Sequence, residues 1–194
     1  MKKYALFIMA SAFFMTAMFN GCQSTNLESA VSSNPQAESA DAQSQADTED
    51  FSDIIEPEQL ISKADAESIL GISVADGEKT ENAVVGQKIC FYDGMNDDIN
   101  GFLQISISQD AFIANAGAMS AESIYTSTKE MFGEDLTPVE GLGDDAFLAT
   151  GGYYILYKGY FISVYSGNTD MPEVIERLDI ASRIAIQNLD ALLQ

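Results

Sequence analysis

Side-chain oxygens at alternate positions can hold a metal ion, and one loop of this chain has them. Asn96, Asp98 and Asn100 occupy every second position, and a glycine follows them. This spacing is typical of the first half of a calcium-binding loop. The match ends there, because Ile107 stands in the place of the bidentate glutamate and offers no oxygen. We therefore expect a solvated hairpin loop here, with a calcium site as the alternative.

Groups for nucleophilic or acid–base catalysis are scarce. The chain has no histidine, which excludes Ser-His-Asp and Cys-His arrangements and removes the commonest zinc ligand. Asp144 and Asp145 are adjacent carboxylates, but neighbours on a strand point to opposite faces and make a poor acid–base pair. Gly141 and Gly143 precede a strand rather than a helix, so they indicate a turn and not a phosphate-binding loop. We expect no enzymatic activity, no catalytic residue and no cofactor.

Tyrosines near the C-terminal half offer a different chemistry, the binding of a ligand. Tyr153, Tyr154, Tyr157, Tyr160 and Tyr165 lie in two segments with strand composition. Because side chains alternate along a strand, about half of them should point to the sheet face away from the helices. An open face of this kind would offer a groove for a small molecule, a glycan, a lipid or a peptide. Aromatic residues also fill strands for packing alone, and we favour that explanation.

Cys22 carries the strongest chemical signal, as a site of lipid attachment. Lys2 and Lys3 precede an uncharged apolar run, the layout of a secretory signal. The run is shorter than the roughly 20 residues of a membrane-spanning helix. It ends in a Gly-Cys pair similar to the site cut by lipoprotein signal peptidase. The sequence predicts a signal peptide over residues 1–21 and acylation of Cys22, which would anchor the protein to the bilayer. Cys90 would then be the one remaining thiol, buried as a small apolar residue.

The following segment predicts a tether between this anchor and a folded domain. Residues 22–56 comprise the acylated cysteine and a stretch rich in Ser, Ala, Gln and acidic residues, with few large apolar side chains. Such a composition does not bury enough apolar surface to fold, so we expect a disordered acidic linker. Residues 57–194 have the length of one domain. That domain would lie at the extracytoplasmic face of the cell membrane.

The charge balance excludes polyanionic partners. Without Lys2 and Lys3 the chain has 9 − 2 = 7 basic residues against 30 acidic ones, a net charge of −23. A surface of this sign repels phosphate groups, so neither nucleic acid nor anionic lipid headgroups are expected to bind it.

Hydrophobic periodicity predicts the elements that position these residues. Helices are expected over residues 56–71, 120–132 and 170–192, and strands over residues 83–92, 102–108, 141–147, 153–158 and 160–166. In the second helix, Ile124, Thr128, Met131 and Phe132 are expected to face inward. The order αββαβββα predicts an α+β fold, with an antiparallel sheet of about five strands and helices packed on one face.

Three short stretches resemble a known family. Leu60–Gly71 is similar to the opening helix of small Gram-positive envelope lipoproteins that carry a domain of unknown function. Cys90–Tyr92 resembles their Cys-x-aromatic strand, and Pro138–Phe147 resembles their Pro-Val-x-Gly-Leu-Gly-Asp-x-Ala-Tyr turn. The resemblance implies an α+β sandwich of PsbP-like type and brings no catalytic residues. Family members often have a cysteine before the first helix that pairs with the strand cysteine; here Glu58 or Gln59 stands there, so that disulfide is absent.

These features predict a membrane-anchored, non-enzymatic binding or accessory module of the cell envelope. The bilayer would be its partner through Cys22, and a small molecule, glycan or protein would be captured on the aromatic sheet. Two alternatives remain open: an enzyme that uses carboxylates on envelope glycans, and a purely structural protein–protein interaction module.

Overall fold

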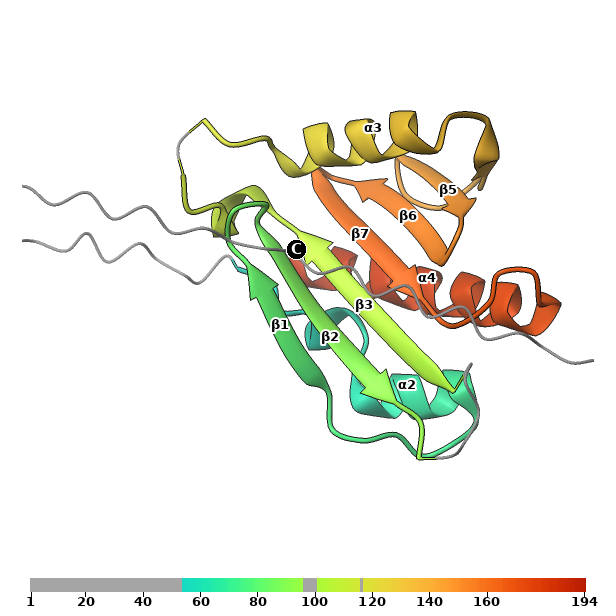
Figure 1. The fold of residues 1–194 in the computed structure, drawn as a ribbon. Coiled ribbons are helices and arrows are strands. Elements are labelled where there is room, and N and C mark those ends of the chain that lie inside the picture. Colours follow the sequence, from blue (N-terminus) through green and yellow to red (C-terminus); the bar gives the residue numbers. More distant parts are fainter. Residues whose placement is uncertain (1–53, 96–100, 116) are drawn as a thin grey trace, which may run out of the picture. The chain divides into compact units, whose positions relative to one another are not determined.

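Seven strands form one antiparallel sheet in the computed structural model, which describes residues 54–95, 101–115 and 117–194 (Figure 1). Their spatial order is β1-β2-β3-β7-β6-β5-β4. The strands are β1 (Glu78–Asn82), β2 (Gln87–Asp93), β3 (Phe102–Ser108), β4 (Thr137–Pro138), β5 (Asp145–Ala149), β6 (Gly152–Tyr157) and β7 (Tyr160–Tyr165). The positions Asn96, Asp98 and Asn100, together with Cys22, lie outside the described residues.

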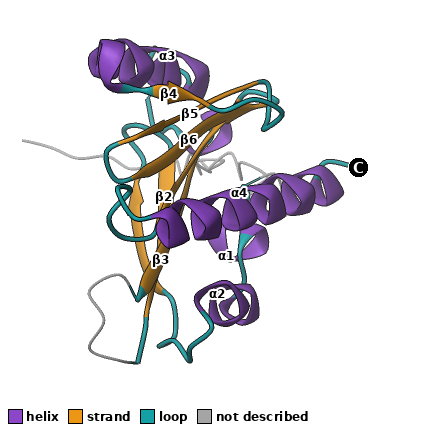
Figure 2. Ribbon diagram, turned by 90° about the vertical axis from the view of Figure 1, so that its right-hand side faces the viewer, coloured by secondary structure: helices purple, strands orange, loops and turns teal. Residues whose placement is uncertain are grey.

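Helices lie on both faces of this sheet. They are α1 (Pro57–Leu60), α2 (Lys63–Leu70), α3 (Ala121–Phe132) and α4 (Pro172–Leu192). Figure 2 shows α1, α2 and α4 on one side of the strands and α3 on the other. The contacts agree, because α3 packs on β6 and β7 through a cluster of buried aromatic residues that is separate from the core beneath α4. The expectation that helices cover one face is therefore wrong.

The predicted α+β class and antiparallel sheet are confirmed, but the number of strands and the element order are not. About five strands were expected in the order αββαβββα, whereas the described order is ααβββαββββα. Strand β1 has no apolar alternation, since all five of its residues are exposed, and β4 has only two residues. The first helix divides in two because Ser62 caps α2 by accepting a hydrogen bond from the Asp65 amide.

The main core lies between α4 and the sheet. Leu178, Ala181, Ala185 and Leu189 of α4 are fully buried, as are the apolar residues of β3, namely Leu103, Ile105 and Ile107. Helical spacing on α4 and alternation on β3 place these two sets face to face. Cys90 is buried in the same core and is a free thiol, as predicted.

Helix α3 occupies nearly the predicted range of residues 120–132, whereas α4 begins later than the predicted residue 170 and one predicted inward position is wrong. Ser120 caps α3 by accepting from the Ser123 amide, and Gly133 follows its last residue. Helix α4 begins after Met171 without a side-chain cap. Met131 was expected to face inward but is 75% exposed, because Tyr125 takes the buried position on α3 instead.

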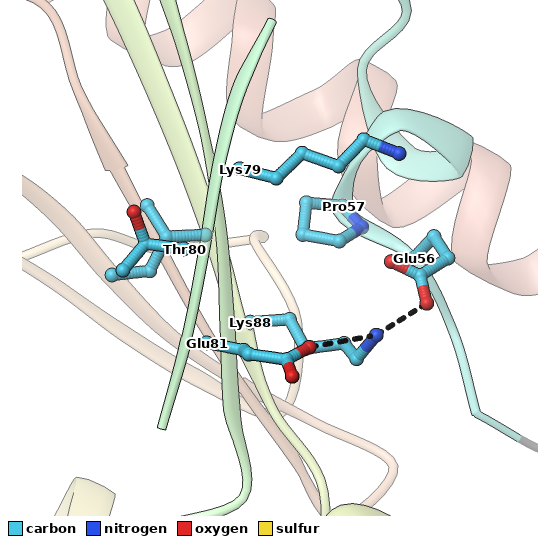
Figure 3. Close-up of a pocket in the computed structure, with 7 residues that line it drawn as sticks. Glu56, Pro57, Lys79, Thr80, Glu81 and Lys88 are labelled. Carbon is cyan, nitrogen blue, oxygen red and sulfur yellow. Dashed lines mark hydrogen bonds and ion pairs between the residues drawn. The ribbon is translucent and has the colours of Figure 1, made fainter. Parts of the chain in front are cut away.

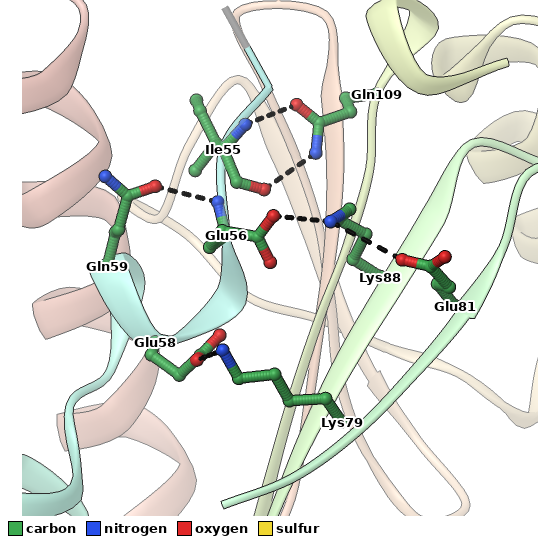
Figure 4. Close-up of polar contacts among 8 residues, drawn as sticks. All are labelled: Ile55, Glu56, Glu58, Gln59, Lys79, Glu81, Lys88 and Gln109. Carbon is green, nitrogen blue, oxygen red and sulfur yellow. Dashed lines mark hydrogen bonds and ion pairs between the residues drawn. The ribbon is translucent and has the colours of Figure 1, made fainter. Parts of the chain in front are cut away.

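Residues 54–59, which we call the lead-in segment, precede and begin helix α1, and polar contacts hold them against the sheet (Figure 4). The buried Gln109 side chain accepts from the Ile55 amide and donates to the Ile55 carbonyl, both at 2.8 Å. Lys88 pairs with Glu56, and Lys79 pairs with Glu58. These contacts make the lead-in segment part of the folded domain, although residues up to 56 were assigned to the linker.

Replacing Gln109 by alanine is expected to lower the free energy of unfolding by about 1–3 kcal/mol, because the buried amide and carbonyl of Ile55 both lose their partner. Urea unfolding measures this loss. Gln104→Ala is the matched control, since Gln104 is half-buried on β3 and makes no such contact. Equal losses in the two variants would contradict the role given to Gln109.

Candidate functional site

The structure divides the five predicted tyrosines between the two faces of the sheet. Tyr153, Tyr157 and Tyr160 lie on the α4 side, where they belong to or pack on the main core. The Tyr157 hydroxyl donates to Asp190 of α4 at 2.7 Å. Tyr154 and Tyr165 lie on the other side, against the α3 cluster. One ligand therefore does not reach all five from a single face.

Helix α3 covers much of the aromatic face. Tyr154 is 7% exposed and stacks on Phe147, with ring centroids 4.9 Å apart. Phe132 of α3 packs on both rings, and Tyr125 of α3 packs on Phe147 and Phe161. Burial raises the pKa of the Tyr154 hydroxyl, so this phenol stays neutral at physiological pH. The aromatic residues here serve as packing under the helix.

A groove remains between α3 and the strands beside it, and we call it the α3 groove. Its volume is about 350 Å³, near the lower end of the range for small-molecule sites. It is lined by Val85, Gln87, Ser108, Ile124, Thr128, Met131, Phe132, Tyr154, Phe161, Ser163 and Tyr165. The sheet supplies the floor and α3 supplies one wall. Two of the predicted tyrosines, Tyr154 and Tyr165, are in this lining.

Small hydroxyl side chains make the floor of the α3 groove. Ser106 of β3 and Ser163 of β7 are direct partners across the sheet, and their hydroxyl oxygens are 2.6 Å apart. Ser108, two residues further along β3, faces the same side by strand alternation. It is 2% exposed and lines the groove, yet its hydroxyl makes no hydrogen bond within the described part of the chain. The hydroxyl oxygen is not fully shielded from solvent, so the floor offers a polar group that a ligand can reach.

The α3 groove has no charged residue in its lining. This contrasts with the rest of the surface, where every lysine and arginine that the structure describes has a partner. The ion pairs are Lys63–Asp76, Lys79–Glu58, Lys88–Glu56, Lys129–Asp145, Lys158–Asp190 and Arg183–Asp179. Because these cations are already neutralised, the described surface offers no basic patch to an anionic ligand.

Asp145, the first residue of β5, pairs with Lys129 in the last turn of α3. Burial is the largest single influence and acts to raise the pKa of Asp145, but the hydrogen bond and charge of Lys129 and a hydrogen bond from the Ala146 backbone together outweigh it, and the pKa lies below the ordinary 3.8. The Tyr125 hydroxyl is buried nearby and lacks a partner in hydrogen-bonding geometry, so we assign the shift chiefly to Lys129. Asp144 instead accepts from the Lys158 amide, so the two adjacent carboxylates do not converge.

The Asp145–Lys129 pair predicts a pH effect on stability. A carboxyl whose folded-state pKa is depressed stabilises the fold above its unfolded pKa, and this contribution is lost as the pH falls through the folded value. Asp145→Asn should therefore lower the free energy of unfolding at pH 7 by no more than about 1 kcal/mol, since both side chains are over a third exposed. Urea unfolding should show the difference disappearing in strongly acidic solution, where the carboxyl is protonated in both the folded and the unfolded state. A difference that persists there, or one that Asp135→Asn also shows, would contradict the assignment.

A second hollow, of about 260 Å³, lies between the lead-in segment and strands β1 and β2 (Figure 3). Its lining includes Glu56, Lys79, Glu81 and Lys88. Lys88 pairs with Glu56 and Glu81 and its side chain is only 13% exposed, while Lys79 pairs with Glu58 of α1. These contacts hold the chain together, so we regard this hollow as structural rather than as a binding site.

The described residues contain neither a cluster of metal ligands nor a helix that could span a membrane. No group of three or more Cys, Asp or Glu side chains is placed to hold a metal ion in residues 54–95, 101–115 and 117–194. In the same part of the chain, no helix combines the length and apolar character needed to cross a bilayer. Comparison with known protein families, curated proteins and solved structures found no match for this chain.

Proposed function

We propose that this protein is a membrane-anchored, non-enzymatic binding module that captures its ligand in the α3 groove. The observation that carries the proposal is an uncharged groove whose floor presents a serine hydroxyl that makes no hydrogen bond within the described residues and stays open to solvent. Concave sites that combine aromatic walls with a few fixed polar groups are typical of small-molecule binding. The described carboxylates do not form a convergent pair at this groove, which favours binding over glycan hydrolysis.

The anchor is the second part of this proposal. The basic n-region, the apolar run and Cys22 support lipid attachment, and the acidic residues that follow support a tether. The envelope lipoproteins named above are the family we propose for it. Growth with a clickable fatty acid should label the protein and leave it in the membrane fraction. Cys22→Ser should remove both the label and the membrane association, and a label that persists in this variant would contradict the anchor.

Ligand capture is tested by thermal unfolding with a panel of uncharged, cationic and anionic small molecules. A compound that binds the folded protein raises its melting temperature by mass action. Uncharged members should do so, and Ser108→Leu, which adds an isobutyl group to the groove floor, should abolish the rise. Ser68→Leu is the matched control, because Ser68 is exposed on α2 on the other side of the sheet. A rise that survives Ser108→Leu would place the site elsewhere.

A further inference from the structure

The α3 groove selects against two large classes of ligand. A charged ligand would lose its hydration without meeting an opposite charge, because no Asp, Glu, Lys or Arg lines the groove. An alkyl chain would be free of that penalty, but it would remove water from the Ser108 hydroxyl and leave this group buried without a partner. An unpaired buried polar group carries a substantial free-energy cost, so the floor favours a ligand that brings its own hydrogen-bonding groups.

The polar groups of the lining are neutral. The Thr128 hydroxyl of α3 already donates to the Ile124 carbonyl, and two side chains with hydrogen-bonding capacity left lie on the sheet floor. Ser108 is unpartnered, and Gln87 of β2 reaches Ser106 only at 3.5 Å, so its side-chain amide has donors and an acceptor left to use. Both side chains lie on the sheet floor. A ligand with several hydroxyl or amide groups on one edge would satisfy them together.

The apolar part of the lining is aromatic and lies beside this polar edge. Tyr165 meets Tyr154 edge-on, with centroids 5.7 Å apart, and is half-buried, so part of its ring remains open. Phe132 of α3 is half-buried as well. Partly open rings of this kind suit a ligand with a flat C–H face, because C–H groups pack favourably on an aromatic ring.

We propose that the α3 groove binds an uncharged saccharide unit. A sugar ring combines a C–H face with hydroxyl groups along its edge and carries no charge, which matches the three features of the lining. A groove of about 350 Å³ accommodates one or two rings rather than a longer chain. The proposal rests on the α3 groove being the binding site.

Isothermal titration of the purified full chain tests the proposal, in a detergent without a sugar headgroup. The probes are N,N′-diacetylchitobiose and cellobiose, with decanoate and a neutral tripeptide as representatives of the other classes. A disaccharide should bind saturably. Ser108→Ala and Gln87→Ala should each weaken binding by about 2- to 10-fold, the loss of one or two hydrogen bonds. Ser68→Ala on α2 should leave the affinity unchanged.

The outcomes separate the ligand class from the site. Binding of a disaccharide that is weakened by both groove variants and untouched by the control supports the proposal. If only decanoate or the tripeptide binds, and Ser108→Leu weakens that binding, the saccharide proposal is overturned. The α3 groove would then still be the binding site. Saccharide binding that neither groove variant weakens overturns the proposal, and so does the absence of binding by every probe, which would also count against the proposed function. Both groove variants should fold, since Gln87 makes one long side-chain contact and Ser108 makes none.

Discussion

Replacing Phe147 by alanine is expected to lower the free energy of unfolding by about 3–5 kcal/mol, the usual cost of removing a fully buried phenylalanine. Phe147 is 0% exposed and contacts Tyr154 on the sheet as well as Tyr125 and Phe132 on α3. Its loss leaves a cavity beneath the helix that these rings do not refill without moving. Urea unfolding with circular dichroism measures the change.

Phe91→Ala is the matched control for this prediction. Phe91 lies on the same face of the sheet, on β2, outside the aromatic cluster beneath α3. Its half-exposed ring contacts that of Phe102, with centroids 5.5 Å apart. We expect Phe91→Ala to lower the free energy of unfolding by about 1 kcal/mol, because folding removes less of this ring's apolar surface from water. If the two variants lose equal stability, α3 does not cover the sheet as described.

Introducing a cysteine at position 58 is expected to cross-link α1 to β2 and to raise the free energy of unfolding by about 3–4 kcal/mol in the oxidised protein. The gain comes from closing a loop of about 30 residues in the unfolded chain. The Glu58 carboxylate lies close enough to Cys90 to influence the thiol, whose pKa is raised chiefly by burial and further by Glu58. One oxygen of Glu58 is buried without a partner, so its removal costs little beyond the exposed ion pair with Lys79.

Gln59→Cys is the control that uses the neighbouring position. The sequence left open whether Glu58 or Gln59 occupies the place of the cysteine in the resembling family. The structure favours Glu58, because Gln59 is exposed and turns back to the Glu56 amide at 2.8 Å. Mass spectrometry should show the loss of two hydrogens in Glu58→Cys and not in Gln59→Cys. A free thiol at both positions 58 and 90 after oxidation would contradict this geometry.

The two halves of the sheet differ in how much of their environment can be predicted from the sequence. Strand β3 alternates apolar and polar residues, which predicts one buried face and an outer face of Gln and Ser. Strands β6 and β7 instead have continuous apolar runs, with Tyr153, Tyr154 and Ile155 all buried. A continuous apolar run indicates that a strand is buried on both faces. Strands β6 and β7 therefore allow the prediction that a helix also covers the face of the sheet away from α4.

Other features lie beyond sequence patterns. The exposed, charged residues of β1 have no period, and their strand forms because β2 pairs with it. The floor of the α3 groove is formed by Ser108 of β3 and Ser163 of β7. These two strands are neighbours in the sheet, although α3 and three strands lie between them in sequence. Neither strand alone shows that its serines face a helix, so the groove emerges only from the long-range pairing.

The most direct test of the α3 groove is the amide spectrum of the isotope-labelled protein, recorded with and without each compound of the thermal-unfolding panel. If the ligand binds in the α3 groove, the shifted amides cluster at Gln87, Ser108, Thr128, Ser163 and Tyr165, on both sides of the groove. Shifts that cluster instead around Glu56, Lys79 and Lys88 would contradict this prediction, because that hollow would then be the binding site.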